Sequence, residues 1–123
     1  MDKAGRQAVD EFEQLRDWEA RAQDAQAKAA QAYSRLVQIA ERHDTGQAAR
    51  VARFLASTYN GVLYPLDLFE LRALDVALAD DAMACIDALR WGKADLYKLL
   101  PDGEARLAAV LQSWGIDKRG AVE

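Results

Sequence analysis

The 123-residue chain contains one cysteine and one histidine, and this scarcity limits the chemistry that it can carry out. A single cysteine excludes an internal disulfide, and one cysteine with one histidine cannot supply the usual ligand set of a zinc site. Cys85 lies in the apolar stretch Met83–Ile86, which predicts a buried thiol rather than a reactive one. We therefore expect no metal and no cofactor.

An acidic stretch is the one feature that suggests a metal ion. Asp75, Asp80, Asp81 and Asp87 follow one another closely, and the spacing of Asp80 and Asp87 places both on one helix face. The stretch has neither a Glu-x-x-His pair of the di-iron type nor a calcium-binding loop. Helix capping and a solvated helix face account for these aspartates without a metal.

The chain also lacks any apolar run near the ~20 residues that span a membrane, and its first residues lack the apolar core of a signal peptide. We expect a cytoplasmic protein with no membrane contact. The formal net charge of −4 opposes the electrostatic attraction that nucleic-acid binding requires. Nucleic acid is therefore not an expected partner.

Proline and glycine are few, and residues 6–42 contain neither. Alanine, glutamine, glutamate, arginine and lysine dominate this stretch, and all are strong helix formers. Helical periodicity recurs in the later segments, and strand-like alternation is missing. The sequence therefore predicts an all-α fold, a small helical bundle with a long N-terminal helix that ends near His43.

Small and apolar residues recur along this first helix at steps of three and four, the spacing of a helix–helix packing seam. The members are Ala8, Leu15, Trp18, Ala22, Ala25, Ala29, Ala32, Leu36 and Ile39, with Glu11 as an interruption. A helix this long needs a partner, and the seam packs either on a second copy of the chain or on its own core. The residues expected to contact a second copy are Leu15, Trp18, Ala22 and Ala25.

We divide the chain into residues 1–33, the N-terminal part of the long helix and a candidate association arm, and residues 34–115, a compact helical domain. Residues 116–123 are expected to form a frayed tail. The sequence leaves open whether residues 68–91 form one helix or two. The residues expected in one core are Phe54, Leu55, Leu78, Ile86, Leu107, Leu111 and Trp114.

The break after His43 carries the remaining polar candidates. Asp44 is expected to cap the next helix, with Gln47 completing a capping box, and Asn60 is expected to end that helix in the left-handed style. Arg50 and Arg53 share a helix face and suit either phosphate or an acidic partner. A second candidate interaction surface therefore consists of Asp44, Gln47, Arg50 and Arg53.

No catalytic residue is expected. His43 beside Asp44 is the one place where an imidazole adjoins a carboxylate, and a histidine at a helix C-terminus usually complements the helix dipole. The chain has no glycine-rich phosphate loop and no serine in a nucleophile elbow. We interpret the protein as a non-enzyme.

Several motifs together resemble a known family. They are Leu36–Ala40, the turn Asp44–Gln47, the helix Arg50–Leu55 with Asn60, the aspartate-rich segment after Asp67, and Trp114. The chain resembles an uncharacterised family of small proteins from Gram-negative bacteria, often encoded on integrative and conjugative elements. The resemblance covers residues 36–114.

This resemblance has two departures. Family members usually carry a pair of tryptophans where this chain has Thr58 and Tyr59, and the first thirty residues look like an addition. The family has no established activity, so the resemblance implies no functional residues. It implies a bacterial accessory-genome context.

The function expected from these observations is a non-enzymatic protein–protein interaction module of the bacterial accessory genome. Its partner is a protein that the sequence does not identify, and the N-terminal helix is available for homodimerisation. The alternative is an anti-defence inhibitor, for example of CRISPR or restriction machinery, carried by a mobile element.

Overall fold

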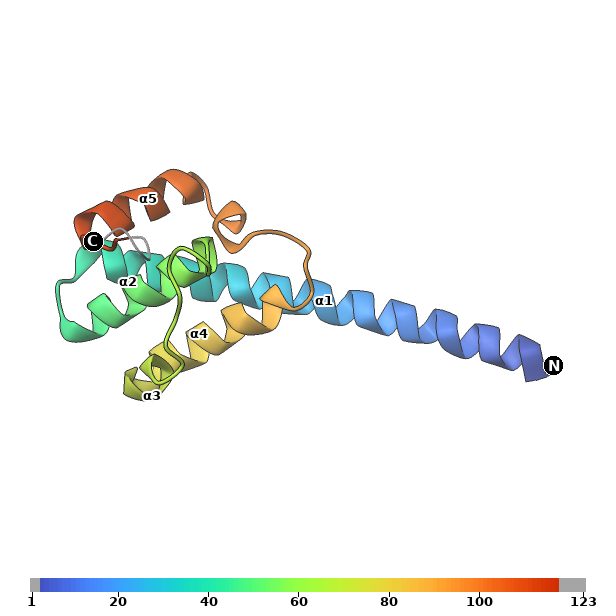
Figure 1. Ribbon diagram of the computed structural model, residues 1–123. Coiled ribbons are helices and arrows are strands. Elements are labelled where there is room, and N and C mark those ends of the chain that lie inside the picture. The colour runs from blue at the N-terminus through green and yellow to red at the C-terminus, as the bar shows by residue number, and fades with distance from the viewer. Residues whose placement is uncertain (1–2, 118–123) are drawn as a thin grey trace.

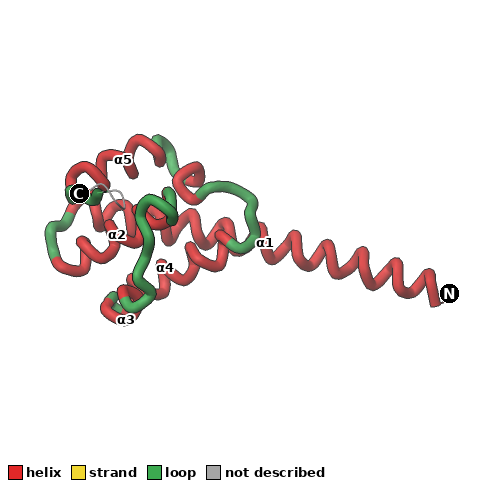
Figure 2. Tube along the Cα trace, viewed as in Figure 1, coloured by secondary structure: helices red, strands yellow, loops and turns green. Residues whose placement is uncertain are grey.

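The computed structural model describes residues 3–117, except for the side chains of residues 3, 4, 6 and 7. Within this range every regular element is a helix and no strand is present (Figure 2), which confirms the all-α prediction. The elements are α1 (Lys3–Arg42), α2 (Gly46–Tyr59), α3 (Glu70–Ala73), α4 (Val76–Leu89), the 3-10 helix η1 (Leu96–Leu99) and α5 (Gly103–Ser113). Residues 68–91 therefore contain two helices, with a break at Leu74 and Asp75.

The long helix α1 has two halves with different surroundings (Figure 1). Its C-terminal half lies inside a body formed by the other helices, and its N-terminal half projects from that body. The helix ends at Arg42, as the sequence predicted. Along the described helices, no segment combines the length and apolar character that crossing a membrane requires.

Helix α4 packs antiparallel to α1 (Figure 1), and this pair forms the most extensive helix–helix contact of the body. The alanines of the α1 seam permit this close approach, because Ala29 and Ala32 are fully buried at the contact side of α1. The guanidinium of Arg35 on α1 donates two hydrogen bonds, of 3.0 and 2.8 Å, to the carboxylate of Asp81 on α4. This two-point contact fixes how the two helices lie along each other.

Helix α2 turns back along α1 through a short connection, and its first turn is capped by Thr45 rather than Asp44. The Thr45 hydroxyl accepts a 3.1 Å hydrogen bond from the Ala48 amide, and Thr45 has the extended backbone of an N-cap. The expectation that Asp44 caps this helix is therefore wrong. The left-handed ending at Asn60 is also wrong, since its backbone is extended and its side-chain oxygen accepts hydrogen bonds from the Val62 and Leu63 amides.

Helix α5 closes the body over the C-terminal end of α1. Two hydrogen bonds of 3.0 and 2.8 Å join Arg106 on α5 to the carboxylate of Glu41 on α1. At the start of α5, the backbone of Gly103 lies so close to the carbonyl of Tyr97 that a Cβ atom would collide with it. Glycine at this position thus permits η1 and α5 to approach each other.

The predicted core residues all belong to one cluster. Phe54, Leu55, Leu107 and Leu111 are buried, and Leu78, Ile86 and Trp114 are partly buried against them. Ile116 also packs on this cluster, so the body extends past the expected start of the tail at residue 116. Residues 118–123 of that expected tail lie outside the described residues.

Candidate interaction surfaces

Residues 3–21 of α1, the arm, project from the body (Figure 1). The arm exposes large apolar side chains. Phe12 is 60% exposed, Leu15 58% and Trp18 43%. Steps of three residues place these side chains within about 120° of the helix circumference. Leu15 and Trp18 continue the face of α1 that α4 covers farther along the helix, and Phe12 lies to one side of that face. The arm thus presents an uncovered extension of an existing packing face.

The rest of the seam is already covered by the chain's own fold. Ala22 and Ala25 are only 2% and 5% exposed, because α4 and η1 pack on α1. These two alanines therefore offer almost no surface to a second chain, which corrects the sequence-based expectation. The packed part of α1 begins at residue 22, whereas the expected boundary between arm and domain was residue 33.

The base of the arm contains a tryptophan that the sequence analysis did not single out. Trp91 follows α4 and lines a hollow of about 400 Å³ together with Leu15, Trp18 and Ala22. The guanidiniums of Arg21 and Arg90 lie 5.4 and 4.9 Å from the centre of its ring, within the range of a cation–π contact. Its indole N–H is buried and has no hydrogen-bond partner among the described residues.

The second predicted surface is engaged within the chain. The Gln47 side chain donates a 2.8 Å hydrogen bond to the Ala73 carbonyl and accepts one of 2.9 Å from the Asp75 amide. It thereby holds the break between α3 and α4, and it takes no part in the expected capping box. Asp44 is exposed and makes no side-chain hydrogen bond within the described part of the chain.

The two arginines of this surface share one acidic partner inside the fold. Arg50 and Arg53 on α2 each lie 3.1 Å from the carboxylate of Glu70 at the start of α3. Together with Gln47, they attach the short helix α3 to the side of α2. The acidic partner that the sequence suggested for these arginines is thus present in the same chain.

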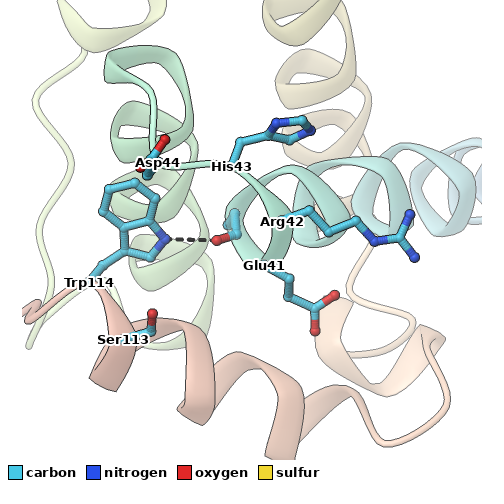
Figure 3. A pocket seen from close by; sticks show the side chains of 7 residues that line it. Glu41, Arg42, His43, Asp44, Ser113 and Trp114 are labelled. Carbon is cyan, nitrogen blue, oxygen red and sulfur yellow. Dashed lines mark hydrogen bonds between the residues drawn. The ribbon is translucent and has the colours of Figure 1, made fainter.

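A hollow of about 420 Å³ next to the end of α1 brings histidine, aspartate and serine onto one rim (Figure 3). The residues are His43, Asp44 and Ser113, and Trp114 lines the same hollow. His43 points away from Ser113, and no hydrogen bond joins the three side chains within residues 3–117. A nucleophile and its base must lie within hydrogen-bonding reach, so this rim lacks the geometry of a catalytic triad.

The acidic residues between positions 75 and 87 contact different partners and not a common centre. Asp81 pairs with Arg35, while Asp87 accepts a 2.7 Å hydrogen bond from Arg90. Asp75 occupies the N-cap position of α4 without a side-chain cap hydrogen bond. Within the described range, no three histidine, cysteine or acidic side chains gather where they could hold a metal ion.

Cys85 is fully buried on α4, as the sequence predicted. Burial raises the pKa of its thiol to about 12, and the nearby Asp81 carboxylate contributes in the same direction. The thiol is thus held in its unreactive, protonated form.

A third hollow was not foreseen, because its residues are distant in the sequence. Tyr59 at the end of α2, Tyr64 in the following connection and Tyr97 in η1 line a space of about 520 Å³. No spacing rule links these positions, and only the packing of η1 and α5 on α2 brings them together.

The fold and these surfaces define an all-α domain with a projecting helical arm. Residues 30–115 match the model of a family of unknown function (DUF7673), and the chain belongs to this family. The matched region begins at residue 30, so the arm lies outside it. No curated protein and no solved structure matches the chain.

Proposed function

We propose that this protein is a non-enzymatic protein–protein interaction module, in which the arm packs on a second copy of the chain. The observation that supports this proposal is the uncovered apolar face of the arm, formed by Phe12, Leu15 and Trp18. Helices are marginally stable alone in water, and contiguous apolar surface at this density is typical of an interaction site. A partner helix covers that face and stabilises the arm.

The geometry of the base of the arm favours an antiparallel partner. Helix α4 runs antiparallel to α1 and ends at Leu89, and beyond its end the same face of α1 continues without cover. A helix that continues the line of α4 would reach Trp18 and Leu15 and enter the hollow beside Trp91. The proposed contact thus extends an interface that the chain already forms.

A second copy meets this requirement with the arm itself. The arm is about 28 Å long at ~1.5 Å per residue, so two antiparallel arms cover each other's apolar faces over several turns. The same residues then lie on both sides of a twofold axis, which closes the assembly as a dimer. Phe12 is the midpoint of residues 3–21, so it lies near the twofold axis when the two arms overlap fully.

Co-purification of two differently tagged copies tests this proposal. We expect the copies to associate, and we expect Leu15→Glu to abolish the association because it introduces a charge into the apolar face. Leu68→Glu is the matched control, since Leu68 is a similarly exposed leucine at 72% on the body of the protein. Equal association of both variants would contradict the role of the arm.

The proposed setting is the cytoplasm of a bacterium, with the gene in the accessory genome. The resemblance of residues 36–114 to proteins of integrative and conjugative elements supports the genetic setting. Examination of the neighbouring genes in genomes that encode this chain tests it. Genes for conjugation or integration are the expected neighbours, and consistently metabolic or ribosomal neighbours would contradict it.

A further inference from the structure

The hollow between α2 and α5 combines aromatic, aliphatic and acidic groups in a way that the arm does not explain. Tyr59 and Tyr97 lie with ring centres 5.5 Å apart and planes inclined by 55°. Leu63 and Leu111 supply aliphatic surface in the same hollow of about 520 Å³. The walls therefore suit a ligand that is apolar along part of its length.

Two carboxylates lie next to tyrosines that line this hollow, although neither carboxylate is itself part of the lining. The Tyr59 hydroxyl lies 3.4 Å from the Glu104 carboxylate, and the Tyr97 hydroxyl lies 3.4 Å from that of Asp95. Asp95 has Lys98 at 3.7 Å, whereas Glu104 has no basic partner within residues 3–117. The pKa of Tyr97 is raised, first by burial and then by the negative charges of Asp95 and Glu104. The Glu104 carboxylate therefore places a negative charge without a basic partner, among residues 3–117, next to the tyrosines of the hollow.

We propose that this hollow binds an arginine side chain of a partner polypeptide. Arginine carries a three-carbon stem and a planar cation, and both parts match the hollow. The stem lies against Leu63 and Leu111, the guanidinium stacks on the tyrosine rings, and Glu104 receives its N–H groups. All these residues lie within the family match at residues 30–115, so the site is independent of the arm and of its dimer.

Nuclear magnetic resonance titration of the full chain with the blocked tripeptide acetyl-Gly-Arg-Gly-amide tests the proposal. We expect saturable shifts at the amides of Asn60, Leu63, Tyr97 and Ala108, which surround the hollow. The same peptide with citrulline, the neutral isostere of arginine, should bind at least about fivefold more weakly because it has no charge. Equal binding of both peptides, or shifts confined to other parts of the chain, would overturn the proposal.

Single substitutions locate the site. Glu104→Gln should weaken arginine binding about three- to fivefold, as expected for the loss of one partly exposed charge contact. Glu13→Gln in the arm is the matched control and should leave binding unchanged. Unchanged binding by Glu104→Gln would contradict the assignment of this carboxylate.

The tyrosine rings are tested by two changes at one position. Tyr97→Phe keeps the ring and should retain arginine binding. Tyr97→Leu keeps apolar volume but should lose most of the arginine binding. If Tyr97→Leu fails to fold, the citrulline comparison and Glu104→Gln still decide the matter. Methylguanidinium alone should bind more weakly than the peptide. Equal affinity would overturn the assignment to a polypeptide side chain, since the stem would contribute nothing.

Discussion

The indole N–H of Trp114 donates a 2.8 Å hydrogen bond to the main-chain carbonyl of Ala40 (Figure 3). Ala40 lies in the last turn of α1, where carbonyls have no partner in their own helix. The tryptophan that follows α5 therefore completes the hydrogen bonding of α1 and holds the two helix ends together.

Replacing Trp114 with phenylalanine should distinguish the contribution of this hydrogen bond to stability from that of ring packing. Trp114→Phe should lower the free energy of unfolding by ~1–3 kcal/mol, because the Ala40 carbonyl loses its partner. Trp114→Ala should cost ~3–5 kcal/mol, since ring packing is lost as well. Urea denaturation measures both, with Ser113→Ala as a control at an exposed neighbour. A Trp114→Phe variant as stable as the parent would contradict the role of the hydrogen bond.

The stability of the fold should depend on both hydrogen bonds of the Gln47 side chain, so even Gln47→Glu should destabilise the protein. Gln47→Glu keeps an acceptor for the Asp75 amide but loses the donor to the Ala73 carbonyl. We expect a loss of ~1–3 kcal/mol in the free energy of unfolding. Gln112→Glu, at an exposed position on α5, should stay within about 0.5 kcal/mol of the parent. Equal stability of the two variants would mean that Gln47 does not hold the break between α3 and α4.

The sequence predicted the helical architecture because periodicity and helix propensity are local properties. It also identified the α1 seam, but not the position at which α4 stops covering it. That position depends on how α4 lies along α1, which contacts between distant residues such as Arg35 and Asp81 determine. The spacing that makes Ala22 and Ala25 candidate arm residues is the same spacing that buries them under α4.

The polar candidates show a second limit of sequence reasoning. Gln47, Arg50 and Arg53 were expected to form one interaction surface with Asp44, but their partners lie 17 to 28 residues away in the same chain. A single sequence does not indicate that Glu70 and the break after Ala73 will meet them. Thr45 displaced Asp44 as the cap because the helix begins one residue later than expected, at Gly46.

Cys85 should resist alkylation in the folded protein. Its pKa of about 12, raised by burial, leaves on the order of one thiolate in ten thousand at pH 8, and the thiolate is the reactive form. Iodoacetamide should label the native protein only at the rate at which the fold opens and exposes Cys85. It should label the urea-unfolded protein rapidly. Rapid stoichiometric labelling without denaturant would show that the thiol is accessible and the α1–α4 contact is looser than described.

The ion pair between Glu41 and Arg106 should give a pH-dependent stability. The hydrogen bonds from Arg106 lower the pKa of Glu41, so the folded state binds its proton less readily than the unfolded state. The stabilisation is therefore present above the unfolded pKa of about 4.3 and is lost as the pH falls through the lower folded pKa. At neutral pH we expect this ion pair to raise the free energy of unfolding by about 0.5–1 kcal/mol.

Urea denaturation from pH 7 to pH 3 compares the parent with Glu41→Gln. The difference in the free energy of unfolding should shrink as the pH falls, because protonation neutralises Glu41 in the parent. Arg106→Gln removes the same pair from the other side and should give a matching profile. A difference between the parent and Glu41→Gln that stays constant over this range would contradict a titrating pair.

Sedimentation equilibrium of the full chain tests the role of the arm most directly. We expect the mass of two chains at micromolar concentrations, and the mass of one folded chain for the double variant Leu15→Glu with Trp18→Glu. The double variant should keep the parent's body, because both residues lie before the buried part of the seam at Ala22. A parent protein that sediments as a monomer over the whole concentration range would contradict the account, as would a double variant that remains dimeric.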